Sequence, residues 1–182
     1  MAALVKACLA PSYPGQTVLV ISNNPDAAGL AFASSNGIAT LAIDHRPFGK
    51  DRAAFDQAID NALREALVDY VCLAGFMRIF TAAFVVSWQG RIINIHPSLL
   101  PLYPGLHTHQ RALEAGDKHH GCTVHFVTEG VDAGPIIAQT SIDILPSDTP
   151  ESLADRVLIA EHKLYPEALA RVLSGKVVFP AI

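Results

Sequence analysis

The sequence predicts an α/β fold with a mainly parallel, Rossmann-like sheet flanked by helices. Two observations lead to this prediction. Short apolar runs rich in β-branched residues alternate along the chain with longer segments whose apolar residues recur at helical spacing. The connections between these segments are short, and no internal repeat or low-complexity stretch interrupts them. Alternation of strands and helices over 182 residues is typical of a single α/β domain.

The first elements form a helix, a strand and a second helix. Residues 2–9 are apolar and helix-prone, and residues 17–21 predict a strand. Pro25 suits the first turn of a helix that reaches about Ser35, and Gly37 is a typical stop signal just beyond it.

The next elements repeat the strand–helix pattern. Strands are expected at residues 40–43 and 70–73, with a helix at 51–67 between them and a short helix at 80–88 after the second strand. The longer helix is predicted by four apolar residues at helical spacing with charges between them, which are Phe55, Ile59, Leu63 and Leu67.

The fourth strand ends in two polar residues. Arg91–Ile93 are typical of a strand buried on both faces, and Pro97 must end the strand because it cannot donate to a sheet. Asn94 and His96 are two residues apart, so both side chains point to the same face where the chain leaves the sheet. Ligands of open α/β sheets bind at that carboxyl edge. The alternative is a buried amide that satisfies the loop backbone, beside a core histidine.

The last third of the chain predicts a helix at 108–114 that ends at Gly116. Strands are expected at 122–127 and 136–144, paired as an antiparallel extension of the sheet. Thr149–Pro150 form a capped start for a helix that reaches about residue 173.

Composition and charge exclude several classes of protein. The net charge is −4 and no Lys/Arg cluster is longer than a pair, which argues against a nucleic-acid-binding protein. No apolar run is long enough for a membrane span, and no secretory signal is recognisable. Cys8, Cys72 and Cys122 are odd in number and far apart, which indicates buried thiols in a reducing compartment. The cytoplasm is therefore the expected location.

Asp132 is the natural partner for His96. It lies in a turn-rich loop between the last two expected strands. A carboxylate beside an imidazole orients the ring and raises its pKa, which prepares it for acid chemistry near neutral pH. The alternative is that Asp132 only forms the turn before Ala-Gly-Pro.

The other histidines invite a metal-site interpretation, which the spacing does not support. There is no H-E-x-x-H motif and no cysteine partner, so no metal is expected. His107 could contact a substrate, whereas His119, His120 and His125 are expected to be surface or strand residues. These histidines are His107, His109, His119, His120 and His125.

Two further residues have a chemical and a structural interpretation. Ser98 could be a nucleophile, but no G-x-S-x-G surrounds it, and no G-x-G-x-x-G or Walker motif occurs elsewhere. Glu161 lies on the last expected helix, near Val157 and Leu164 at helical spacing, and could be a solvated charge or a site residue.

Several motifs together resemble the glycinamide ribonucleotide formyltransferase family over essentially the whole chain. They occur in family order and are Leu73–Ile79, Asn94–Pro101, Tyr103–His109, Val124–Thr128, Asp132–Pro135 and Glu161–Pro166. The resemblance implies the formyltransferase fold. It also implies transfer of a formyl group from the co-substrate 10-formyltetrahydrofolate to the amine of glycinamide ribonucleotide, in purine biosynthesis and without a metal.

The resemblance makes Asn94, His96 and Asp132 the catalytic set. Attack by the amine creates a tetrahedral oxyanion, which the Asn94 amide and a protonated His96 could stabilise. One such donor typically lowers the barrier by about 3–4 kcal/mol. Asp132 would keep His96 charged and help to move a proton to the departing folate nitrogen.

The resemblance also implies binding residues. Either Arg52 or Arg78 suits the glutamate tail, and apolar walls suit the pterin ring. The folate contacts implied by the family are Arg52, Met77, Arg78, Ile79, Phe80, Asn94, Thr128, Glu129, Gly130, Val131 and Asp132. The ribonucleotide contacts are Leu158, Ile159, Ala160 and Glu161. No nucleic-acid or membrane partner is expected, and the chain would act as a monomer or homodimer.

The resemblance departs at the amino terminus. Family members begin with a strand and a Gly-rich loop that ends in Ser-Asn and binds the substrate phosphate at a helix N-terminus. Met1–Leu4 stand where that loop would join its helix. Residues 1–182 are therefore expected to be one formyltransferase domain that lacks the first strand and phosphate loop, with Met1 an internal residue of a longer natural chain. Low stability or weak activity is expected for the chain as given.

Three other functions remain open. A formyltetrahydrofolate hydrolase would use water as the acceptor and usually has an added N-terminal domain. Methionyl-tRNA formyltransferase would need a further C-terminal domain and an Arg-Gly loop in place of Tyr103–His107. A non-catalytic or impaired folate-binding remnant is the alternative from a different class.

Overall fold

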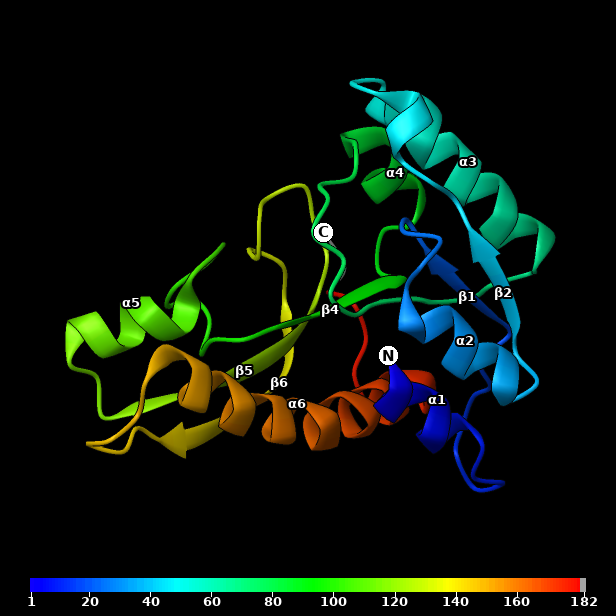
Figure 1. The fold of residues 1–182 in the computed structure, drawn as a ribbon. Helices are drawn as coiled ribbons and strands as arrows, with labels where there is room; N and C mark the ends of the chain where they lie inside the picture. The colour runs from blue at the N-terminus through cyan, green and yellow to red at the C-terminus, as the bar shows by residue number, and fades with distance from the viewer. Residues whose placement is uncertain (181–182) are drawn as a thin grey trace.

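Helices pack against two sheets in the computed structural model, which describes residues 1–180 (Figure 1). The predicted α/β class is confirmed. Residues 181 and 182, which belong to the expected single domain, lie outside the described residues. Each expected helix and strand occurs within a few residues of its predicted position. The short 3-10 helix η1 is the one described helix that the sequence pattern did not predict.

The elements have the following bounds in chain order. They are α1 (Ala2–Cys8), β1 (Leu19–Ser22), α2 (Ala28–Ser35), β2 (Ala39–Ala42), η1 (Arg46–Phe48), α3 (Arg52–Glu65), β3 (Val71–Leu73), α4 (Ala82–Ser87), β4 (Ile92–His96), α5 (Thr108–Ala115), β5 (His119–Phe126), β6 (Ile136–Asp143) and α6 (Pro150–Leu173).

Side-chain caps explain where several helices begin and end. The Asp51 carboxylate accepts a hydrogen bond from the Ala54 amide at the start of α3. Thr149 and Ser152 form a reciprocal capping box at the start of α6. Gly116 has a left-handed conformation at the end of α5, as its position after the helix predicts.

The described strands form two separate sheets. One is the parallel pair β1–β2, and the other has the order β3–β4–β5–β6. In the second sheet β3 and β4 are parallel, while β5 and β6 add the predicted antiparallel extension. The β1–β2 pair lies beside α2 and α3, apart from β4, β5 and β6, which extend along α6 (Figure 1). The sheet is therefore interrupted between β1 and β3.

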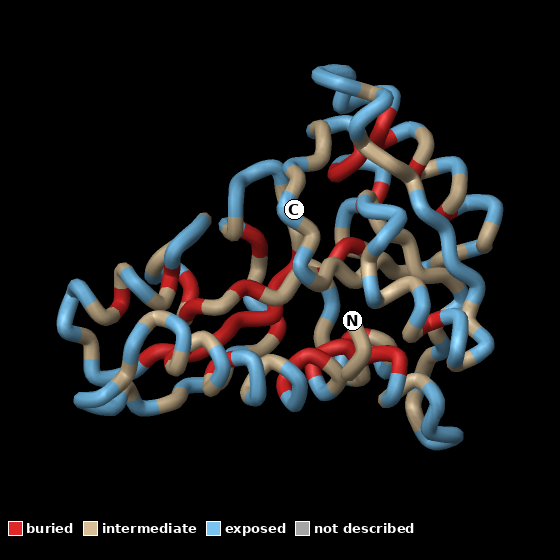
Figure 2. Tube along the Cα trace, in the orientation of Figure 1, coloured by how far each residue is buried: buried red, intermediate tan, exposed pale blue. Residues whose placement is uncertain are grey.

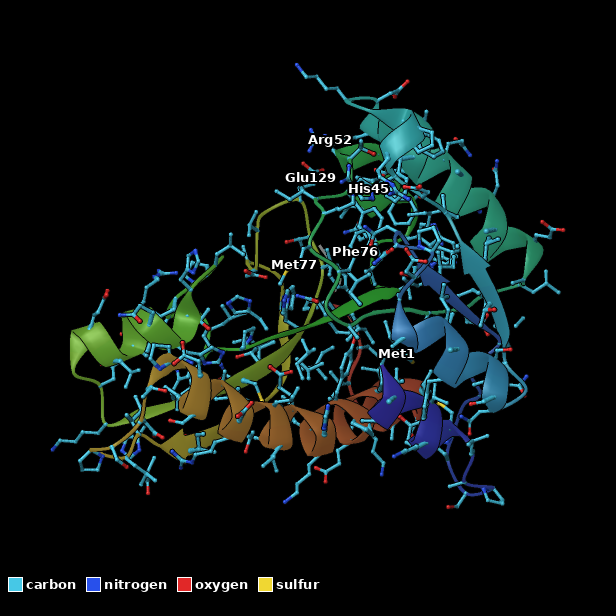
Figure 3. All side chains as sticks on the ribbon, in the orientation of Figure 1. Met1, His45, Arg52, Phe76, Met77 and Glu129 are labelled. Atoms are coloured by element: carbon cyan, nitrogen blue, oxygen red, sulfur yellow. The ribbon has the colours of Figure 1, made fainter. Side chains whose placement is uncertain are left out.

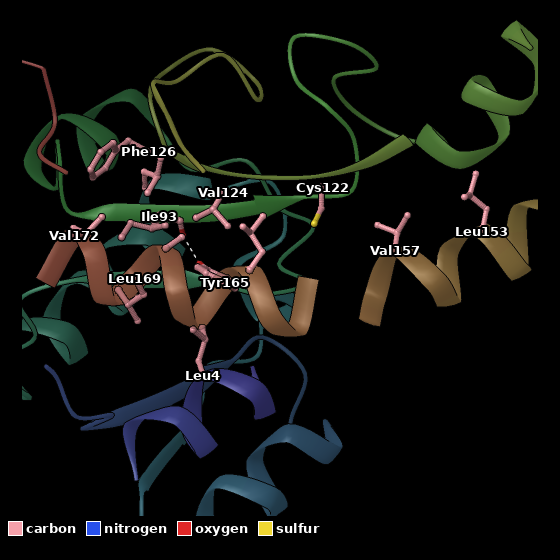
Figure 4. Packing of buried hydrophobic residues seen from close by; sticks show 13 residues of the cluster. Leu4, Ile93, Cys122, Val124, Phe126, Leu153, Val157, Tyr165, Leu169 and Val172 are labelled. Carbon is pink, nitrogen blue, oxygen red and sulfur yellow. Dashed lines mark hydrogen bonds between the residues drawn. The ribbon is translucent and has the colours of Figure 1, made fainter. Parts of the chain in front are cut away.

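Strand β4 is buried on both faces, as its apolar run predicts. Ile92 packs into a cluster with residues of α3 and α4, and Ile93 packs into a second cluster with residues of α6. Neither isoleucine is exposed. Figure 4 shows the second cluster, in which Leu4 of α1 also reaches α6. This double packing holds the end of β4, and therefore the polar residues that follow, in a fixed position.

Burial is uneven between the two sheets (Figure 2). All residues of β5 except His119 are buried, whereas every residue of β1 is only half-buried and every residue of β2 is exposed. No helix within residues 1–180 has the combined length and apolar character needed to cross a membrane.

Candidate active site

The end of β4 brings Asn94 and His96 to the same face. The alternation of the strand places Ile93 toward α6 and both polar side chains on the opposite side. The strand ends at His96, directly before Pro97. His96 is buried and Asn94 is half-buried. The predicted convergence of an amide and an imidazole at this edge is thus present in the structure.

Asp132 completes the predicted group. Its Oδ2 lies 3.3 Å from His96 Nδ1, with 12% of the Asp132 side chain and 7% of the His96 side chain exposed. The other ring nitrogen, His96 Nε2, lies 2.9 Å from the carbonyl oxygen of Tyr103. Because a carbonyl and a carboxylate only accept hydrogen bonds, each ring nitrogen of His96 faces an acceptor.

The Asp132 carboxylate lies between a backbone amide and two imidazole rings. The Gly105 amide donates to Asp132 Oδ2 over 2.8 Å. Although burial alone would raise the pKa of Asp132, the neighbouring His125, the Gly105 amide and His96 lower it below its ordinary value. Asp132 also has a positive φ of 51°, a conformation that non-glycine residues rarely adopt. Such local strain is frequent at functional sites.

The structure adds His125 to this site. The sequence predicted only a surface or strand residue at this position. It is a strand residue, but it is 2% exposed. Its Nε2 lies 3.2 Å from Asn94 Nδ2 and 3.7 Å from Asp132 Oδ1, while its Nδ1 lies 2.9 Å from the Phe126 carbonyl oxygen. If Nδ1 donates to that carbonyl, Nε2 accepts from Asn94. The second hydrogen of the Asn94 amide then remains free for a ligand.

Gly134 allows the loop that carries Asp132 to lie against the sheet. A Cβ atom at this position would overlap the Phe126 carbonyl oxygen, which belongs to the backbone and cannot move aside easily. The same carbonyl accepts from the His125 ring. The close approach at Gly134 thus places the loop and the imidazole around one backbone group.

Buried hydroxyls fix the proline-rich loop after β4. Thr123 Oγ1 donates to the Ser98 carbonyl oxygen and accepts from the Leu100 amide, while Gln139 donates to the Leu100 carbonyl oxygen. Ser98 itself is fully buried, and its hydroxyl donates to the Leu102 carbonyl oxygen over 2.6 Å. Ser98 is thus a structural residue in this conformation, which argues against the nucleophile interpretation.

The residues expected to contact folate divide into exposed and packed groups. Met77, Ile79 and Val131 are 81%, 60% and 55% exposed, although they are apolar. Figure 3 labels three of these residues, of which Arg52 starts α3, Met77 lies in the loop after β3 and Glu129 lies in the loop after β5. Thr128 is half-buried, and Glu129 and Gly130 are exposed.

Phe80 and Arg78, which are also expected to contact folate, pack against aromatic side chains of the protein. The Phe80 ring stacks on Phe76 and Phe84, with centroids 4.8 and 4.2 Å away. The Arg78 guanidinium lies 5.2 Å from the centre of the Phe55 ring. Of the two arginines expected for a glutamate tail, Arg52 is thus the more exposed.

The expected ribonucleotide contacts lie together on α6. Leu158 and Ile159 are 46% and 59% exposed, while Ala160 and Glu161 are half-buried. Burial raises the pKa of Glu161, and the nearby amino group of Met1 partly opposes this shift. Burial also lowers the pKa of the Met1 amino group, and the nearby Cys72 and Glu161 partly offset this shift. Glu161 and Met1 are thus electrostatic neighbours.

The remaining histidines do not form a metal centre within the described chain. His109 Nδ1 and His120 Nε2 lie 3.2 Å apart, and His119 pairs with Asp143 on the surface. His107 precedes α5 and is exposed. Among residues 1–180, no group of three or more His, Cys, Asp or Glu side chains is placed to hold a metal ion.

Comparison with known proteins reveals extensive similarity. A family model described as formyl transferase matches residues 1–169. The chain is 49% identical over 175 residues to the trifunctional purine biosynthetic protein adenosine-3 of Homo sapiens, covering 96% of this chain and 17% of that protein. It is 42% identical over 174 residues to phosphoribosylglycinamide formyltransferase of Escherichia coli, covering 96% of this chain and 82% of that protein.

Solved structures agree with these relatives. Phosphoribosylglycinamide formyltransferase from Brucella melitensis superposes with a TM-score of 0.90 at 50% identity, over 99% of this chain and 92% of that one. Glycinamide ribonucleotide transformylase 1 from Symbiobacterium toebii gives a TM-score of 0.94 at 44% identity, over 99% and 84%. The present chain spans only 12% to 17% of the trifunctional relatives from Drosophila melanogaster and Bos taurus.

Proposed function

Because the chain belongs to the formyl transferase family, we propose that it transfers the formyl group of 10-formyltetrahydrofolate to the amine of glycinamide ribonucleotide in purine biosynthesis. The names of its E. coli and B. melitensis relatives support this reaction. The observation that carries the proposal is the convergence of Asn94, His96 and Asp132, with His96 Nδ1 3.3 Å from Asp132 Oδ2.

The first step is attack of the substrate amine on the formyl carbon. The carbonyl bond becomes single, and the oxygen acquires negative charge. The free hydrogen of the Asn94 amide is available to that oxygen, because the other is directed to His125 Nε2. A protonated His96 adds positive charge close to the same point. Each donor that strengthens in the transition state lowers the barrier by about 3–4 kcal/mol.

The second step moves one proton. The attacking nitrogen becomes positively charged and must lose a proton, while the folate nitrogen must gain one before its bond to the formyl carbon breaks. Asp132 accepts hydrogen bonds beside His96, and its lowered pKa keeps it ionised near neutral pH. It is therefore suited to accept the proton from the amine and to pass it on to the folate nitrogen, directly or through water. The products are the formylated amine and tetrahydrofolate.

His96 can donate a hydrogen bond to the oxyanion only after one of its ring nitrogens loses its present acceptor, either the Tyr103 carbonyl oxygen or Asp132. Its Nε2 lies against the Tyr103 carbonyl oxygen and its Nδ1 faces Asp132. In the present conformation Asn94 is therefore the direct donor to the oxyanion. Movement of the loop at Tyr103 would release Nε2 for the reaction.

The surroundings fit the two substrates. Exposed apolar side chains at Met77, Ile79 and Val131 suit one flat face of a pterin ring. Arg52 at the exposed start of α3 suits the carboxylates of the glutamate tail. Glu161 on α6 suits the amine-bearing end of the ribonucleotide. We propose that Arg78, Phe80, Thr128, Glu129, Gly130, Leu158, Ile159 and Ala160 complete the binding surface, as the family resemblance implies.

The proposal is tested by following tetrahydrofolate formation with and without glycinamide ribonucleotide. Turnover that requires the ribonucleotide supports the transferase, and equal release of formate without it would identify a hydrolase instead. Substitution His96→Ala should reduce kcat at least 100-fold with unchanged folding by circular dichroism. His119→Ala is the matched control, since His119 is exposed and paired with the exposed Asp143.

Binding measurements separate an inactive remnant from an enzyme. Calorimetric binding of tetrahydrofolate without formyl transfer at any ribonucleotide concentration would identify a folate-binding protein without turnover. We propose that residues 1–182 act as one formyltransferase domain in the cytoplasm, as a monomer or homodimer and without nucleic-acid or membrane partners. The three free cysteines support a reducing compartment.

A further inference from the structure

Helix α3 holds both ends of α4 through two carboxylates that lie one turn apart. Asp56 and Asp60 are separated by four residues, so their side chains share one face of α3. Asp56 Oδ2 accepts a hydrogen bond of 2.6 Å from the Thr81 amide at the start of α4. Asp60 Oδ1 accepts one of 2.7 Å from the indole nitrogen of Trp88, which caps the other end. The position of α4 on α3 is therefore fixed at both ends.

The two carboxylates differ in their burial. Asp56 is 4% exposed, whereas the side chain of Asp60 is 16% exposed and also pairs with Arg64. A buried carboxylate is unfavourable unless hydrogen-bond donors compensate for its lost hydration. Aspartate is also a poor residue for the interior of a helix. The bond to Thr81 therefore explains an aspartate at position 56 better than the stability of α3 does.

Thr81 follows the loop of residues 74–80, which contains four of the residues expected to contact folate. Within the described chain, the backbone of this loop makes no hydrogen bond to other protein groups. Its two ends are anchored instead. Before the loop, the Leu73 carbonyl oxygen lies 3.0 Å from the Tyr165 hydroxyl. After the loop, the Thr81 amide bonds to Asp56. The course of the loop thus depends on these two anchors and on the packing of its side chains.

Side chains along this loop alternate between packed and exposed positions. Phe76 and Phe80 are half-buried and stack on each other, with ring centroids 4.8 Å apart. Met77 and Ile79 lie between them in the sequence and are 81% and 60% exposed. Such alternation is typical of an extended segment, in which a slip by one residue exchanges the two faces. A fixed end at Thr81 prevents that slip and keeps the same two apolar side chains on the outside.

We propose that Asp56 is a positioning residue for folate binding, which holds the Thr81 amide and thereby keeps Met77 and Ile79 directed toward the pterin ring. The inference rests on the proposed function, because that function places the folate at this loop. Asp56 needs no contact with the folate, since its buried carboxylate is directed to the start of α4. Asp60 holds the end of α4 that is farther from the loop along the chain, so it should not affect folate binding.

The test is the affinity for tetrahydrofolate of the variants Asp56→Ala and Asp56→Leu, measured by isothermal titration calorimetry. Both variants remove the acceptor. Leucine keeps a branched side chain that fills the site, which covers the case in which the space left by alanine disturbs folding. We expect the dissociation constant for tetrahydrofolate to rise about tenfold or more, because the loop is displaced. The dissociation constant for glycinamide ribonucleotide should change less than twofold. Hydrogen exchange should increase at residues 76–81.

Two further variants separate positioning from general stability. Asp56→Asn keeps an oxygen that can accept from Thr81, so its affinity for tetrahydrofolate should stay within threefold of that of the starting protein. Asp60→Ala is the matched control, because it removes the same kind of bond at the opposite end of α4. It should lower the urea midpoint of unfolding and leave the affinity for tetrahydrofolate within twofold.

The outcomes distinguish this role from the proposed reaction. The positioning role is overturned if Asp56→Leu binds tetrahydrofolate as tightly as the starting protein, or if Asp56→Asn or Asp60→Ala weakens binding as much as Asp56→Leu. A starting protein that binds tetrahydrofolate but transfers no formyl group overturns the reaction alone, because the role of Asp56 is measured by binding. A starting protein that does not bind tetrahydrofolate overturns both.

Discussion

His125 stands directly opposite Asn94 in the antiparallel pairing of β4 with β5, and its Nε2 lies 3.2 Å from the Asn94 amide nitrogen. The imidazole is also 3.7 Å from Asp132 Oδ1. One buried ring therefore contacts two of the three residues proposed to act on the formyl group. It does not need to touch a substrate to matter, because it sets the orientation of the amide and the position of the acid.

Substitution His125→Ala should reduce kcat by about 100-fold, because small displacements of reacting groups have effects of this size. KM for both substrates should change less than threefold if His125 acts only through Asn94 and Asp132. The measurement is steady-state kinetics with a pH profile, in which the acidic limb should shift as Asp132 loses the neighbouring imidazole that lowers its pKa. His119→Ala is the control, and a fall in its kcat equal to that of His125→Ala would contradict the positioning role.

Substitution Asp132→Asn should change the acid stability of the protein as well as its activity. The pKa of Asp132 is lowered in the folded state, so its ionised form stabilises the fold. This contribution is complete above the ordinary pKa of about 3.9 and is lost as the pH falls through the lower folded value. Urea unfolding between pH 6 and pH 2.5 should therefore show a shallower acid loss for Asp132→Asn. Parallel curves for both proteins would refute this linkage.

Elements whose determinants are local could be predicted from the sequence. Proline at position 97 ends β4, and the apolar pair Ile92–Ile93 explains why this strand is buried on both faces. Asp51 and Thr149 cap the helices that follow them. These effects act within a few residues, so the local sequence is sufficient to predict where such helices and strands begin and end.

The role of His125 could not be predicted in this way, because it depends on pairing between residues 31 positions apart. A register shift between Val124 and His125 further changes the local pairing with β6. Propensity and alternation do not specify register across a sheet.

His120 should make the protein less stable in mild acid. Burial and the neighbouring His109 lower the pKa of His120 from 6.5 to about 4, and the side chain is 1% exposed. Between these pH values the unfolded chain binds a proton that the folded chain excludes, so stability rises with pH. The free energy of unfolding should fall by about 3 kcal/mol from pH 7 to pH 4 through this group.

Comparison with His120→Gln isolates that contribution from other acid-sensitive groups. The variant should lose less stability over the same range, while His119→Gln should follow the starting protein because His119 is exposed. Chemical unfolding at half-unit pH intervals provides the measurement. A His120→Gln curve with the same slope as that of the starting protein would show that His120 stays accessible to protons.

Gly134→Ala should disturb the loop of Asp132 while most of the fold persists. The added Cβ would meet the Phe126 carbonyl oxygen, so the loop must move away from β5. We expect a loss of about 1–3 kcal/mol of stability, as for other overpacked positions, and at least a 100-fold lower kcat because Asp132 moves with the loop. Hydrogen exchange should increase in residues 128–134 and remain unchanged in α6. Gly29→Ala is the matched control, since the nearest atom to its Cβ is the flexible end of Met1. If Gly134→Ala keeps full activity, the close approach at Gly134 is not what positions Asp132.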